Sequence, residues 1–120
     1  MSFEATVRQS GDVIIIDLGG RIVLNDGSAA MREAIAKQRG EGASKILLNL
    51  AGVSFMDSSG LGELASAYAG VNKAGGQLKL ANLPPRIIDL LRITKLDSVL
   101  PAFPDEAAAL LSFVAGAASA

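Results

Sequence analysis

The sequence contains no cysteine, no histidine and no tryptophan. The absence of cysteine and histidine excludes disulfides, thiol nucleophiles, imidazole bases and the common ligands of zinc. No other set of acid and base residues replaces them, so we expect neither an enzyme nor a cofactor or metal site. Aromatic residues make up only 4% of the chain, which predicts a core of aliphatic side chains.

Charge of either sign is also scarce. Eleven basic and 12 acidic residues leave a net charge of -1, and no basic run stands out, so no nucleic-acid partner is expected. The N-terminus lacks the pattern of a signal peptide. The uncharged stretch from Ala107 to Ala120 is shorter than the ~20 residues of a transmembrane helix. We expect no membrane partner and a cytoplasmic location.

The hydrophobic pattern predicts one α/β domain over residues 1–120. Strands are expected at 3–8, 13–18, 46–50 and 78–81, with a possible last strand at Val99-Leu100. Helices are expected over 29–39, after Gly60, after Pro84-Pro85 and from Pro104. Gly19-Gly20 is expected to end the second strand. The fold class is therefore a mixed, largely parallel sheet of four to five strands, opening with a β-hairpin and flanked by about four helices.

The last helix is expected to pack on the sheet and to end in a frayed tail from about residue 116. Four of its residues are predicted to face inward: Ala107, Leu110, Leu111 and Val114.

The most informative segment joins the third strand to the second helix and reads Asp57-Ser58-Ser59-Gly60-Leu61-Gly62. A helix N-terminus has free backbone N–H groups and a partial positive charge, so it can host an anion, including a phosphate on a local serine. Gly60 and Gly62 permit close approach of another backbone. The simpler interpretation is that Asp57, Ser58 or Ser59 caps the helix, although the strict capping box is missing.

Two other patterns start in the same segment. Residues 60–65 fit the dinucleotide fingerprint, but no acidic residue follows at the end of the next strand. Asp57 also resembles the acceptor of phospho-accepting receiver domains. Those domains need an acidic pair after the first strand, and here Asp12 stands alone in a hairpin turn.

The segment from Ile46 to Gly62 closely resembles the signature of the STAS-domain family, specifically the bacterial anti-sigma factor antagonists. Weaker similarity covers residues 75–78, 84–93 and 103–110. The resemblance implies binding to an anti-sigma factor that is also a serine/threonine kinase, with release of a sigma factor. It also implies that this kinase phosphorylates Ser58 and weakens the complex, and that a serine phosphatase resets it. Asp57, Ser59, Gly60 and Gly62 would belong to the docking surface.

The sequence departs from the family after the second strand, where a Gly-x-Leu-Asp pattern is common. Here Gly20-Arg21-Ile22-Val23-Leu24 is followed by Asn25 and Asp26. This loop is part of the partner surface in relatives, so Asn25 and Asp26 are candidate partner-binding residues. An alternative within the family is a STAS subunit that docks constitutively in a stress-signalling scaffold or a transporter complex.

Overall fold

The computed structural model describes residues 2–118, which form a five-stranded sheet, four helices and one short 3₁₀ turn. Along the chain the elements are β1 (Glu4–Ser10), β2 (Val13–Ile22), α1 (Ser28–Gly40), β3 (Lys45–Met56), α2 (Ser58–Lys73), β4 (Gln77–Ala81), α3 (Pro85–Ile93), the 3₁₀ turn (Leu96–Ser98), β5 (Ala102–Phe103) and α4 (Glu106–Ala118).

The strands lie side by side in the order of the sequence. β1 pairs with β2 in an antiparallel hairpin, and every later pair is parallel, so the predicted mixed sheet is confirmed. β3 is the longest strand. Its first part, Ile46 to Asn49, pairs with both β2 and β4. Its last part continues to Met56 against β2 alone and carries the chain to the start of α2.

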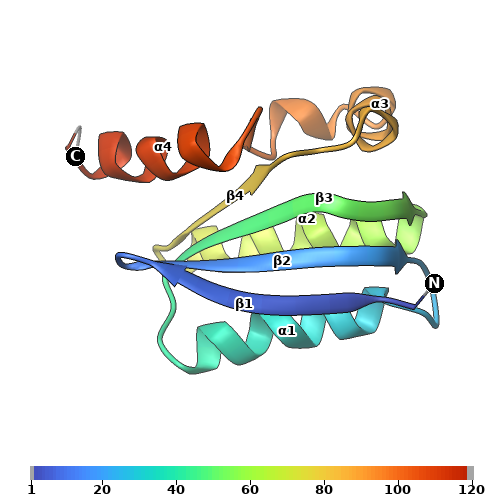
Figure 1. Ribbon diagram of the computed structural model, residues 1–120, viewed down its shortest axis with the longest axis horizontal. Coiled ribbons are helices and arrows are strands. Elements are labelled where there is room, and N and C mark those ends of the chain that lie inside the picture. Colours follow the sequence, from blue (N-terminus) through green and yellow to red (C-terminus); the bar gives the residue numbers. More distant parts are fainter. Residues whose placement is uncertain (1, 119–120) are drawn as a thin grey trace.

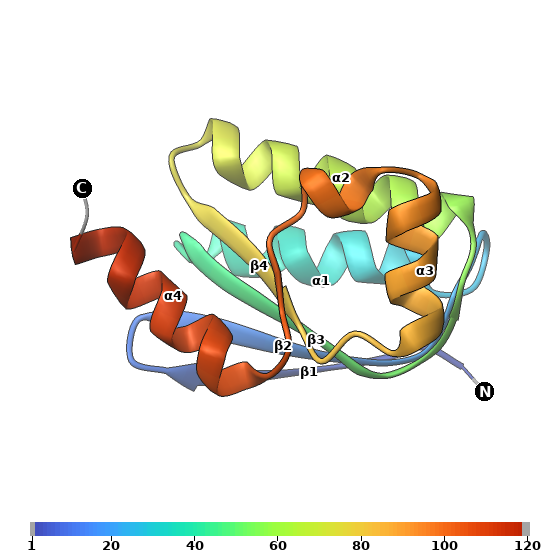
Figure 2. The same cartoon turned by 90° about the horizontal axis from the view of Figure 1, so that it is seen from above.

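The helices form layers on the two sides of the sheet. Figure 1 shows α2 behind the strands β2 and β3. In Figure 2, α1, α2 and α3 lie on one side of the sheet and α4 on the other, with α3 near the carboxyl ends of β2 and β3. The larger core cluster joins α1, α2 and α3 to one face of the strands through aliphatic side chains such as Ile16, Leu48 and Leu64. A smaller cluster around Phe113 holds α4 to the opposite face. The core is aliphatic, as the scarcity of aromatic residues predicted.

The second strand is longer than the sequence indicated. The prediction that Gly19-Gly20 ends it is wrong, because β2 continues to Ile22. The pairing with β3 shifts register on both sides of these glycines, so they mark bulges inside the strand. Gly20 has φ of 83°, and a Cβ there would lie 2.2 Å from the carbonyl oxygen of Ser2. The conformation therefore requires glycine.

The C-terminal predictions need two corrections. The last strand is Ala102–Phe103 rather than Val99-Leu100, since Leu100 lies inside the core and Val99 is half exposed. The inward face of α4 is formed by Ala109 and Phe113, with Leu110 partly buried beside them as predicted. Ala107 is exposed, and Leu111 and Val114 are 69% and 64% exposed. Apolar residues occur all round this helix, so periodicity alone does not identify the buried face.

Only part of the predicted frayed tail lies within the described residues. The helix α4 continues through residues 116–118, and residues 119 and 120 lie outside the described residues.

Candidate functional site

The candidate site begins where β3 ends and α2 begins. Met56 is the last residue of β3 and is buried, which anchors the strand end in the core. Asp57 follows as the N-cap of α2, with extended backbone angles. Its Oδ1 accepts hydrogen bonds of 3.0 Å from the backbone N–H groups of Ser59 and Gly60. Of the three capping candidates in the sequence, Asp57 is the one that caps the helix.

The second carboxylate oxygen of Asp57 holds a different part of the chain. Its Oδ2 accepts a 3.1 Å hydrogen bond from the backbone N–H of Leu24, in the turn between β2 and α1. The hydrogen bond from Gly60, followed by that from Leu24, lowers the pKa of Asp57. The side chain is therefore ionised at neutral pH and joins the start of α2 to the neighbouring turn.

The two serines of the motif differ in accessibility. Ser58 is exposed at the first position of α2. The Oγ atom of Ser59 is buried and has no hydrogen-bond partner among the described residues. Ser58 is therefore open to solvent, whereas the hydroxyl of Ser59 is not.

The two glycines of the motif have different surroundings. Gly60 is buried against β2, and a Cβ there would lie 2.4 Å from the carbonyl oxygen of Ile22. Gly60 therefore lets α2 approach the sheet, and its predicted place in the docking surface stays a prediction. Gly62 is exposed with open space around it, and Ser66 and Ala69 continue this small-residue face along α2.

The turn after β2 is tightly built. Val23 and Asp26 exchange two backbone hydrogen bonds of 2.9 and 3.0 Å, and Asn25 between them has φ of 66°. Gly27 has φ of 109°, and a Cβ there would collide with the carbonyl oxygen of Arg21 at 2.2 Å. The backbone that presents residues 24–26 is therefore fixed by hydrogen bonds and by a glycine that no other residue can replace cheaply.

An open groove runs between this turn and the two helices. It is lined by Leu24, Asn25, Ser28, Ala29, Arg32, Ser59, Gly62, Glu63 and Ser66. Asn25 thus lies beside the serine turn as predicted, whereas Asp26 is exposed but does not line the groove. A 2.6 Å ion pair between Arg32 of α1 and Glu63 of α2 crosses the groove.

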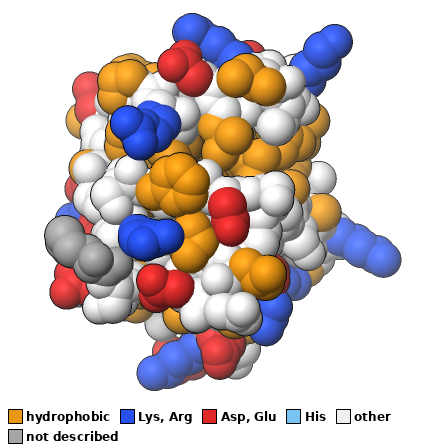
Figure 3. Space-filling view, turned by 90° about the vertical axis from the view of Figure 1, so that its right-hand side faces the viewer, with side chains coloured by type: hydrophobic (Ala, Val, Ile, Leu, Met, Phe, Trp, Pro, Cys, Tyr) orange, Lys and Arg blue, Asp and Glu red, His pale blue; other side chains and the backbone are white. Residues whose placement is uncertain are grey.

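Two exposed apolar residues of this region were not found from the sequence. Leu24 is 65% exposed at the rim of the groove, and Phe55 is 40% exposed near the end of β3. Figure 3 shows the end of the molecule where β2 and β3 finish, with hydrophobic side chains lying among basic and acidic ones. The position of Leu24 in a short polar turn could have indicated its exposure, because an aliphatic side chain in such a turn does not reach the core.

Within residues 2–118 no three acidic residues cluster closely enough to hold a metal ion. None of the helices in that range combines the length and apolar character needed to cross a bilayer.

Comparison with known proteins identifies relatives along nearly the whole chain. The STAS domain family model matches residues 4–109. The anti-sigma-B factor antagonist of Bacillus subtilis is 34% identical over 100 residues, which is 83% of this chain and 90% of that protein. The anti-sigma F factor antagonist of Paenibacillus polymyxa is 29% identical, covering 92% of this chain and 94% of that protein. The solved structure of SpoIIAA from Bacillus in its phosphorylated form superposes with a TM-score of 0.67 at 22% identity, covering 88% and 96%.

Proposed function

This chain belongs to the STAS domain family, and we propose that it acts as an anti-sigma factor antagonist whose docking is controlled by phosphorylation of Ser58. The observation that carries the proposal is the exposed Ser58 at the N-terminus of α2, beside an ionised Asp57 and an open face of small residues. The role is binding rather than catalysis. It places the protein in the cytoplasm, where sigma factors act.

The docking surface consists of the open face of α2 together with the turn after β2. Gly62, Ser66 and Ala69 are small and exposed, so a partner backbone can approach the helix closely. Asn25 lines the same groove, and the exposed side chain of Leu24 adds an aliphatic contact at its rim. Asp57 contributes indirectly, because its carboxylate fixes both parts of this surface relative to one another.

Phosphorylation opposes docking by adding charge at the centre of this surface. A phosphate on Ser58 adds about -1.5 to -2 charges where a close and nearly neutral approach is needed. The neighbouring Asp57 is already ionised, so two negative groups then meet the partner at the same place. A loss of about 3 kcal/mol of docking energy weakens binding more than roughly a hundredfold.

The proposed partners are an anti-sigma factor with serine/threonine kinase activity, which transfers the phosphate from ATP, and a serine phosphatase that removes it. The phosphorylated form of SpoIIAA shows that a structural relative exists in such a state. In this chain the exposure of Ser58 and the burial of the Ser59 hydroxyl favour Ser58 as the acceptor.

The test combines mass spectrometry with binding measurements. Peptide mapping of the protein from its own cells is expected to place a phosphate on Ser58. In binding assays with the anti-sigma factors of the same genome, Ser58→Ala keeps the affinity and Ser58→Asp weakens it. Ser59→Ala is the matched control, since its hydroxyl is buried and makes no hydrogen bond to the described residues.

Equal affinity of the Ser58→Ala and Ser58→Asp variants contradicts the switch. A protein that binds its partner but carries no phosphate under any growth or stress condition supports constitutive docking instead. An acyl phosphate on Asp57, cleaved by hydroxylamine, supports the receiver-like alternative. That outcome conflicts with the structure, in which both oxygens of Asp57 accept backbone hydrogen bonds.

A further inference from the structure

The first strand leaves one edge of the sheet open. β1 pairs with β2 alone in the described part of the chain, and all seven of its residues are exposed. Its register is unbroken from Glu4 to Ser10, so no bulge twists the edge away. It contains neither proline nor lysine, which commonly protect such edges. The strand therefore presents a free row of backbone donors and acceptors to a further strand.

One face of this edge is apolar. Ala5 pairs with Leu18 and Val7 pairs with Ile16, so both point to the side covered by α1. The helix α1 does not bury the side chains of β1, and Val7 is 45% exposed. Val7 also lines an open groove between β1 and the C-terminal end of α1. A strand added here could bury apolar side chains against Ala5 and Val7.

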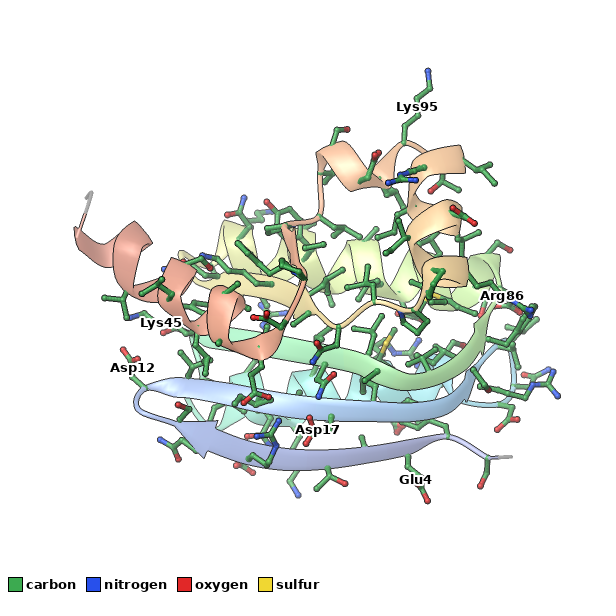
Figure 4. The ribbon with its side chains drawn as sticks, turned by 45° about the horizontal axis from the view of Figure 1, so that its top comes forward. Glu4, Asp12, Asp17, Lys45, Arg86 and Lys95 are labelled. Atoms are coloured by element: carbon green, nitrogen blue, oxygen red, sulfur yellow. The ribbon has the colours of Figure 1, made fainter. Side chains whose placement is uncertain are left out.

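The other face of the edge is acidic. Arg8 donates hydrogen bonds of 2.6 and 2.9 Å to Asp17 and of 2.6 Å to Glu106, so its single positive charge is shared between two carboxylates. Glu4 lies on the same face, with no ion pair among the described residues (Figure 4).

The acidic excess extends around the whole edge. In the groove beside Val7, Glu41 has no salt bridge within the described residues, and Asp12 is paired with Lys45 at 2.7 Å. Five carboxylates lie on β1, pair with its arginine or line its groove: Glu4, Asp12, Asp17, Glu41 and Glu106. Arg8 and Lys45 are the cations paired with them, so the local charge is -3 in a chain of -1.

We propose that the β1 edge binds an extended segment of a partner protein in which basic residues alternate with apolar ones. In such a strand, the apolar side chains face Ala5 and Val7, and the basic side chains face Glu4 and the pair of carboxylates around Arg8. A second copy of this chain is a poor occupant, since two edges of charge -3 repel each other.

The inference is independent of the proposed serine switch. Figure 2 shows β1 and α2 on opposite sides of the molecule, so a strand on β1 leaves the serine turn free.

The test uses the full chain labelled with ¹⁵N and a capped peptide of alternating lysine and valine. Saturable shifts of the Ala5–Gln9 amides and slower hydrogen exchange there are expected, because the peptide adds a strand. A peptide with glutamate in place of lysine is expected not to bind. Of two further peptides, one is N-methylated at its valines and the other at its lysines. Because alternate N–H groups of a strand point to the same side, one of them should lose binding and the other keep it.

Protein variants test the charge term. Glu4→Lys is expected to weaken binding about fivefold, since it replaces an attraction by a repulsion on the paired face. Glu33→Lys makes the same charge change on the exposed side of α1 and is the matched control. The proposal is overturned if the peptide does not bind or if the shifts centre outside β1. It is also overturned if the two variants have equal effects or the two N-methylated peptides give the same result. Self-association through β1 also overturns it.

Discussion

Gly60 provides the sharpest test of how the serine turn is built. In Gly60→Ala the new methyl group lies 2.4 Å from the carbonyl oxygen of Ile22 and 2.9 Å from Cγ of Met56. The carbonyl of Ile22 also accepts the backbone N–H of Asp57, so it cannot retreat without disturbing the cap. Overpacking of this kind costs about 1–3 kcal/mol, whereas alanine in a helix gains up to about 1 kcal/mol over glycine. We expect a net loss of about 1–2 kcal/mol.

Gly62→Ala is the matched control, because it makes the same chemical change two residues later with nothing within 4 Å of the new methyl group. Here the helix propensity acts alone and stabilises the protein by about 0.5–1 kcal/mol. The two variants should therefore differ by about 1.5–3 kcal/mol, or roughly 10 °C in Tm for a domain of this size.

The measurement is urea and thermal unfolding followed by far-UV circular dichroism, since the chain has no tryptophan. Equal stability of the two alanine variants would show that α2 moves away from β2 at little cost. The close contact between Gly60 and Ile22 would then have no role in shaping the site.

Three further predictions concern charged groups. Hydrogen bonds, first from the N–H of Gly60, lower the pKa of Asp57. The stability that Asp57 provides is therefore present above its unfolded pKa and is lost as pH falls through the folded value. In Asp57→Asn, the free energy of unfolding should fall less steeply with pH in this acid range. Arg8→Ala should lower the free energy of unfolding in urea by about 1 kcal/mol. Because Arg8 lowers the pKa of Asp17, the same variant should also lose less stability when the pH falls. Burial lowers the pKa of Lys79, so its contribution to stability rises with pH between the folded value and the ordinary value near 10.5. Unfolding of Lys79→Met at alkaline pH should lack this rise.

Much of the fold could be predicted from patterns that depend on neighbouring residues. The apolar residues Ile46, Leu47, Leu48 and Leu50 predicted the central strand, because only a strand covered on both faces is apolar on both. The motif from Asp57 to Gly62 located the site for a similar local reason. An acidic residue and two serines before an amphipathic helix are explained by the helix end itself.

The remaining features depend on contacts between distant segments. The bulges at Gly19-Gly20 and the burial of Gly60 both require β2 to lie beside β3 and α2, which no local pattern contains. The bond from Leu24 to Asp57 spans 33 positions and was likewise invisible in the sequence. The buried face of α4 was decided by Phe113, whose ring lies 4.6 Å from Nζ of Lys79 on β4.

The unequal pairing along β3 has a consequence for mobility. Residues Ile46 to Asn49 are held by strands on both sides, whereas the part leading to Met56 is paired only with β2, across the bulges. Such a strand is stiff at one end and compliant at the other, and its amides should show a gradient of hydrogen exchange. The serine turn is attached to the compliant end. If Ser58 is phosphorylated as proposed, we expect the turn to respond by local adjustment around the buried Met56, while the paired end of the same strand keeps the core closed.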